Sequence, residues 1–101
     1  MQNHEEIIIN YIENCDLTDD EKAIFIGLLL ALVSYCYEER DSHTPKTLKQ
    51  LFPIEAWENI DENYGKTLGK HVQYLAKVGG LPLTDTGKKT SSNHRLYIIN
   101  K

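Results

Sequence analysis

Cysteines and long apolar runs are scarce in this chain of 101 residues. The two cysteines, Cys15 and Cys36, match no metal or redox spacing, so we interpret them as reduced, buried apolar side chains of a cytoplasmic protein. The longest apolar run, 23–37, is shorter than the roughly 20 residues of a membrane-spanning helix. We therefore expect a core helix there and no membrane contact. Residues 1–6 also lack the positively charged start of a signal peptide.

Groupings of residues that carry catalysis or bind metals are missing as well. The four histidines are scattered and form no pair at i, i+4, which argues against a zinc site. Gly65-Lys66-Thr67 resembles the end of a P-loop, but Ile60 stands where that motif needs its first glycine. No nucleophile–base pair and no paired carboxylates stand out. We expect no enzyme activity, no metal and no cofactor.

The charge of the chain is distributed unevenly. A formal net charge of −4 is unusual for a nucleic-acid-binding protein. Residues 66–101, however, contain seven basic residues and one acid, Asp85, for a net charge of +6. Residues 1–65 contain four basic and 14 acidic residues, for a net charge of −10. Such asymmetry is typical of nucleic-acid contact at one end and a separate role for the acidic end.

The N-terminal part predicts two helices. The acids at the start of 4–14 favour a helix, although its three consecutive isoleucines also fit a strand. Thr18 and Glu21 form a capping box that begins a second helix, apolar nearly all round and ending near residue 40. We interpret it as a core helix, with a homodimer or partner surface as the alternative. The segment 1–41, with a net charge of −8, is then an acidic helical extension packing on residues 42–101, in one compact domain.

Short helical turns follow the second helix. Thr44 as N-cap and Pro45 as first helical residue predict a helix over 46–52. One or two further turns at 54–60 carry Trp57, which we place in the core because glutamates flank it.

The C-terminal part predicts a helix and a hairpin. After a loop at 61–65, an amphipathic helix covers 66–78 and ends at Gly79-Gly80. Strands at 81–84 and 94–100 enclose the polar turn 85–93. This order of elements is that of a winged helix-turn-helix domain, with the hairpin as the wing. The expected fold class is therefore α+β, mostly α.

Two basic elements in this part are candidate nucleic-acid contacts. On the helix, three lysines and a tyrosine follow a spacing of i, i+4, i+8 and i+11: Lys66, Lys70, Tyr74 and Lys77. Charged, hydroxyl and amide side chains gather near the hairpin turn: Lys88, Lys89, Ser91, Ser92, Asn93, His94 and Arg95. Such groups reach phosphate oxygens, and an aromatic ring stacks a base for about 1–3 kcal/mol. Each element alone is also an ordinary solvated surface. Whether Tyr64, Tyr74 and Tyr97 stack on bases or lie in the core stays open.

The residue types favour one function among three. Lysines with few arginines suit sequence-tolerant binding of single-stranded DNA better than base-specific reading. The alternative is a regulator that binds duplex DNA as a dimer through the apolar helix. A third hypothesis is a protein-interaction adaptor that acts through the acidic segment 1–41.

Part of the sequence resembles a known family. The matching residues lie within 45–99, and the most specific stretch runs from Gly87 to Tyr97. It resembles small winged-helix proteins, formerly a domain of unknown function, encoded by staphylococcal cassette chromosome and related mobile elements. The resemblance implies binding of single-stranded DNA without an OB-fold. It also implies a role in replication of the element beside its helicase or polymerase. The first 40 residues carry no matching motif.

Overall fold

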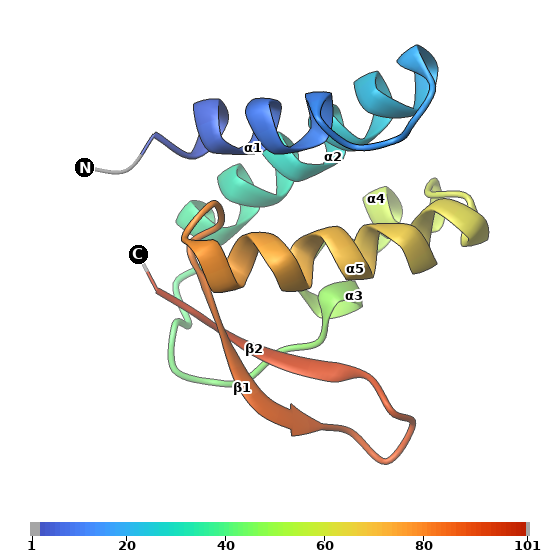
Figure 1. Cartoon of the computed structure of the whole chain (residues 1–101). Coiled ribbons are helices and arrows are strands. Elements are labelled where there is room, and N and C mark those ends of the chain that lie inside the picture. The colour runs from blue at the N-terminus through green and yellow to red at the C-terminus, as the bar shows by residue number, and fades with distance from the viewer. Residues whose placement is uncertain (1–2, 101) are drawn as a thin grey trace.

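The computed structural model describes residues 3–100. Residues 1, 2 and 101 lie outside that range. They include two of the residues 1–6 considered above for a signal peptide, and Lys101, the last basic residue of the segment 66–101. The fold is α+β and mostly α, as predicted (Figure 1). Its elements are α1 (His4–Glu13), α2 (Asp19–Glu38), α3 (Leu48–Leu51), α4 (Ile54–Glu58), α5 (Glu62–Val78), β1 (Leu83–Lys89) and β2 (Arg95–Ile99).

Both N-terminal helices form as predicted. α1 is a helix and not a strand; Asn3 caps it, and it buries Ile8 and Ile12. The capping box of α2 is present, since Thr18 Oγ1 accepts from the backbone N–H of Glu21 at 3.2 Å and Glu21 Oε1 accepts from that of Thr18 at 3.0 Å. α2 is apolar nearly all round, yet only one face is buried. Ile24 and Tyr37, on other faces, remain 38% and 51% exposed.

One hydrophobic core joins the acidic and basic parts of the chain. α1 and α2 bury six side chains in it: Ile8, Ile12, Phe25, Leu29, Leu32 and Cys36. α5, the loop after it and the hairpin contribute their own buried side chains: Leu68, Val72, Leu75, Leu81, Leu83, Tyr97 and Ile99. The segment 1–41 therefore builds the core together with the rest. Cys15 is only partly buried, contrary to the prediction, and no disulfide joins the two cysteines.

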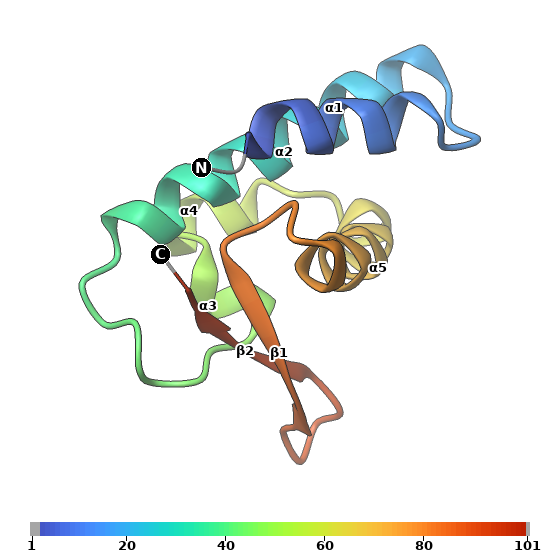
Figure 2. The same ribbon diagram turned by 60° about the vertical axis from the view of Figure 1, so that its left-hand side comes forward.

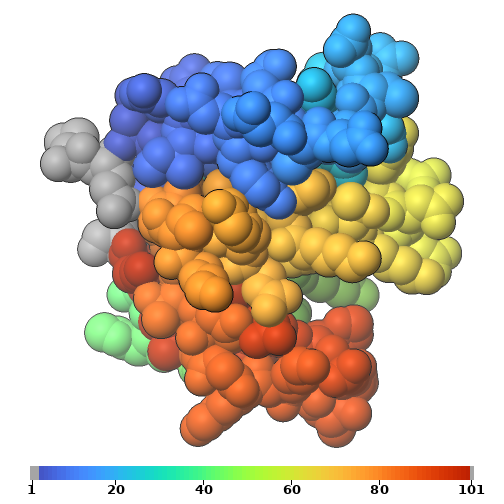
Figure 3. Space-filling view, viewed as in Figure 1, coloured from blue at the N-terminus to red at the C-terminus, as the bar shows by residue number. Residues whose placement is uncertain are grey.

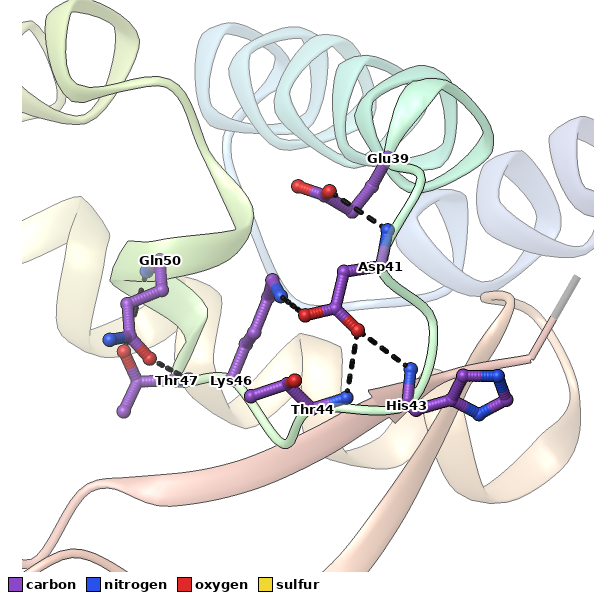
Figure 4. A network of polar contacts seen from close by, with 7 residues as sticks. All are labelled: Glu39, Asp41, His43, Thr44, Lys46, Thr47 and Gln50. Carbon is purple, nitrogen blue, oxygen red and sulfur yellow. Dashed lines mark hydrogen bonds and ion pairs between the residues drawn. The ribbon is translucent and has the colours of Figure 1, made fainter.

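The start of α3 differs from the prediction. Thr44 and Pro45 do not begin a helix; the N-cap is Thr47. Its Oγ1 accepts from the backbone N–H of Gln50 at 3.3 Å, and Gln50 Oε1 accepts from that of Thr47 at 2.9 Å (Figure 4). The capping box of Thr47 and Gln50 thus replaces the predicted start at Thr44 and Pro45, and the predicted helix over 46–52 shrinks to 48–51.

Asp41 holds the loop before α3 in place. Its carboxylate accepts hydrogen bonds of 3.0 Å from the backbone N–H groups of His43 and Thr44, and it pairs with Lys46 Nζ at 3.5 Å (Figure 4). Hydrogen bonds from Thr44 and His43 keep the pKa of the Asp41 carboxyl below its usual range. Lys46 also forms an antiparallel β-bridge with Tyr97. The backbone is therefore extended at residue 46, and a helix begins only after it.

α5 and the hairpin have different bounds from those predicted. α5 begins at Glu62 because Asp61 accepts from the backbone N–H of Asn63 at 2.9 Å as N-cap; the predicted loop 61–65 is mostly helix. It ends as predicted at Gly79, whose φ of 82° suits a residue without Cβ. β1 extends to Lys89, so 85–89 belong to a strand with a bulge and not to the turn. The hairpin points away from α1 and α2 (Figure 2).

No helix within residues 3–100 combines the length and the apolarity needed to cross a membrane.

His71 is the one polar side chain among the buried residues described. Its Nδ1 lies 2.8 Å from Tyr11 Oη, and its Nε2 is buried with no hydrogen-bond partner. The ring of Phe25 packs edge-on against it at 5.0 Å between centroids. Burial lowers the pKa of His71 and raises that of Tyr11 to about 12, so both groups are neutral at neutral pH.

This burial predicts a loss of stability in acid. As the pH falls through the ordinary histidine pKa of 6.5, His71 takes up a proton more readily in the unfolded chain than in the fold, where burial lowers its pKa. The free energy of unfolding should therefore fall between about pH 7 and pH 5, and more steeply than in His71→Asn, whose amide still reaches Tyr11. Urea denaturation at several pH values measures both slopes. Equal slopes for the two proteins would contradict the assignment.

Candidate nucleic-acid interface

A groove of about 1010 Å³ runs between α5 and the hairpin. Figure 3 shows the surface hollowed there, with α3 behind it. α5 lines this α5–hairpin groove with Gly65, Lys66, Gly69, Lys70 and Gln73. The hairpin adds Lys89, Asn93, His94, Arg95 and Tyr97. The rest of the lining comes from the first residue of α5, Glu62, and from the segments before it: Thr47, Leu48, Lys49, Trp57, Glu58, Ile60 and Asp61.

The groove unites about half of the residues predicted to bind nucleic acid. Six of them line it: Lys66, Lys70, Lys89, Asn93, His94 and Arg95. Five others are exposed but lie outside it: Tyr74, Lys77, Lys88, Ser91 and Ser92. Tyr74 and Lys77 follow Lys70 towards the C-terminal end of α5, so they continue its charged face beyond the groove.

Arg95 is held by an ion pair. Its Nη1 donates to Asp85 Oδ2 at 2.8 Å across the hairpin, and both side chains are partly buried. The single acid of the basic segment is therefore neutralised within the hairpin. This pair fixes Arg95 at the wall of the groove, whereas the lysines around it are flexible and exposed.

Two groove residues were not among the predicted contacts: Lys49, and Trp57, which packs against the core as predicted but also lines the groove. Lys49 reaches the groove because the bridge between Lys46 and Tyr97 brings α3 beside the hairpin, a long-range contact that no local pattern signals. Trp57 is only partly buried. Its ring packs on Phe52, with ring centroids 5.8 Å apart. It also lines the groove next to Gly65, where a Cβ would lie 4.0 Å from the Trp57 ring.

The three tyrosines left open by the sequence have different surroundings. Tyr97 is 3% exposed and belongs to the core. Tyr64 packs against the ring of Phe25. Tyr74 stacks on Tyr11, with centroids 4.6 Å apart and planes inclined by 19°, yet 47% of it remains exposed. Of these three tyrosines, Tyr74 therefore presents the most exposed ring to a ligand.

A glycine in the middle of α5 has no packing reason. A Cβ at Gly69 would meet nothing within 4 Å, and glycine costs a helix interior roughly 0.5–1 kcal/mol relative to alanine. Gly69 lies on the groove between Lys66 and Lys70. The backbone of α5 is thus uncovered where the charge is concentrated. Gly27 of α2 is equally open but lies outside the groove.

Comparison with known proteins yields no relative: no family model, no curated protein and no solved structure matches this chain. Within residues 3–100, no three or more His, Cys, Asp or Glu side chains are grouped so as to hold a metal ion. The lysines, amides and exposed backbone of the groove suit a phosphate-bearing ligand, and three carboxylates, Glu58, Asp61 and Glu62, also line it.

The stacked tyrosines give a stability prediction. Tyr74→Ala removes the ring that covers Tyr11 and should lower the free energy of unfolding by about 1 kcal/mol, as expected for an aromatic pair. Tyr74→Phe keeps the ring and should stay close to the wild type. Urea denaturation of the three proteins measures this. Unchanged stability in Tyr74→Ala would mean that the two rings do not pack in solution.

Proposed function

We propose that this protein binds single-stranded DNA, without sequence selectivity, along the α5–hairpin groove. One observation carries the proposal. Five cationic side chains from three separate parts of the chain converge on this groove: Lys49, Lys66, Lys70, Lys89 and Arg95. Such convergence in a chain of negative net charge is not expected of a merely solvated surface.

The lining favours phosphate contact over base reading. Lysine acts as a mobile point charge, whereas specific major-groove reading relies on arginine, asparagine or glutamine forks. The only arginine of the groove is already paired with Asp85. The exposed part of Tyr74 offers a surface for a base where the charged face leaves the groove. These features suit a strand held by its backbone.

The resemblance of residues 45–99 supports a setting for this activity. It suggests replication of a mobile element in the cytoplasm, beside a helicase or polymerase encoded by the same element. Reduced cysteines agree with that compartment, since Cys15 and Cys36 form no disulfide.

A duplex-binding regulator is the second candidate, because the order of α3, α5 and the hairpin is that of a winged helix-turn-helix. Ile24 near the start of α2 and Tyr37 near its end are exposed apolar side chains that a dimer could cover. Selection from a random duplex pool separates the two functions: an enriched motif favours the regulator, and its absence favours sequence-tolerant binding.

Salt dependence tests the contribution of the lysines. On single strands, the slope of log affinity against log salt is about −0.7 for each phosphate neutralised. Lys66→Ala/Lys70→Ala should therefore weaken binding and flatten the slope by about 1.4, as measured by fluorescence anisotropy of a labelled oligonucleotide. Lys22→Ala/Arg40→Ala, which removes the same charge outside the groove, should leave the slope nearly unchanged. Equal effects of both pairs would argue for non-specific attraction only.

Gly69 gives an independent test of whether the DNA strand passes close to α5. Gly69→Ala should stabilise α5 by about 0.5–1 kcal/mol, but weaken binding severalfold because its methyl group keeps the DNA backbone away from the helix. Gly27→Ala should stabilise α2 to a similar degree without affecting binding. Thermal unfolding and anisotropy of both variants provide the measurement. If Gly69→Ala bound as tightly as the wild type, close approach to α5 would be excluded.

A further inference from the structure

The α5–hairpin groove carries opposite charges at its two ends. Glu58, Asp61 and Glu62 line it where α4 ends and α5 begins. Lys66 and Lys70 follow one and two turns further along α5. Asp61 is occupied as the N-cap, but Glu58 and Glu62 are exposed, and neither side chain makes a hydrogen bond or ion pair within residues 3–100. Two carboxylates without an ion-pair partner among the described residues therefore lie at one end of the groove, where the first lysine, Lys66, follows Glu62 by one helical turn.

Local helix chemistry accounts for only part of this arrangement. An acid in the first turn of α5 is favourable beside the positive end of the helix dipole, which explains Glu62. Glu58 is the last residue of α4, where a negative charge gains nothing from the dipole. Its position on the groove calls for a different explanation.

The acids lie where they would repel the phosphates of a bound DNA duplex most strongly. A winged-helix protein that reads a duplex inserts the N-terminal residues of its recognition helix into the major groove, between two rows of phosphates. B-DNA carries one negative charge per roughly 1.7 Å of its axis, so acids at that end of the helix face phosphates of at least one strand. In this chain the corresponding residues are Glu62, next to Asp61, and nearby Glu58.

A single strand avoids this repulsion. Its one row of phosphates can lie between Lys66, Lys70 and Lys89 and continue past Lys77, away from the acids. We propose that Glu58 and Glu62 are specificity determinants that reject duplex DNA, so that the groove retains one strand. This inference rests on the proposed function and adds a repulsive element to the attractive one, the usual way in which binding specificity is sharpened.

Neutralising the two acids tests the inference. Glu58→Gln/Glu62→Gln should raise affinity for duplex DNA about fivefold and affinity for a single strand of the same sequence less than about twofold. Anisotropy with labelled single-stranded and duplex oligonucleotides measures both. The control is Glu5→Gln/Glu13→Gln, which changes the net charge equally at two exposed positions of α1, outside the groove. It should leave the ratio of the two affinities unchanged.

The outcomes separate the inference from the function on which it rests. A selective gain for duplex in the groove variant alone supports the inference. Equal gains for both forms of DNA, or the same gain in the α1 control, overturn it and leave single-strand binding intact. A wild-type protein that fails to bind a single strand contradicts the proposed function itself. Circular dichroism of each variant ensures that folded proteins are compared.

Discussion

The backbone pairing of Lys46 with Tyr97 is the constraint on which the candidate site depends. Each residue donates its N–H to the other's carbonyl oxygen at 2.8 Å, and the side chain of Tyr97 is buried in the core. This bridge ties the hairpin to the segment that leads into α3. Without it, the hairpin would lack a fixed position relative to α3, and Lys49 would not share a groove with Lys89 and Arg95.

The same architecture separates the two signs of charge. α1 and α2 cover one side of α5, and the hairpin extends on the opposite side (Figures 1 and 2). No acid of segment 1–41 lines the α5–hairpin groove. α1 and α2 also complete the core through residues such as Ile8 and Phe25. The net charge of −4 therefore does not represent the charge of the groove. Basic side chains outnumber acidic ones in its lining, and the acidic ones lie at the α4–α5 junction.

Local chemistry was sufficient to predict most helices and the hairpin, because each signal lies within a few residues. The capping box of Thr18 and the C-terminal stop at Gly79 are examples. The start of α3 could not be predicted in this way. Thr44-Pro45 satisfies the local rule for a helix start, but pairing of residue 46 with residue 97 keeps that segment extended. The basic face of α5 was predictable, whereas the inclusion of Lys49 and Trp57 in the groove depends on that same long-range pairing.

Binding of nucleic acid in the α5–hairpin groove can be mapped residue by residue. The measurement is a titration of the isotope-labelled protein with a short single-stranded oligonucleotide, followed by NMR chemical shifts. The largest shifts should fall on the backbone amides of Gly65, Gly69, Gln73 and Asn93 and on the indole N–H of Trp57. Shifts concentrated on α1 and the exposed side of α2, with the groove unaffected, would contradict it.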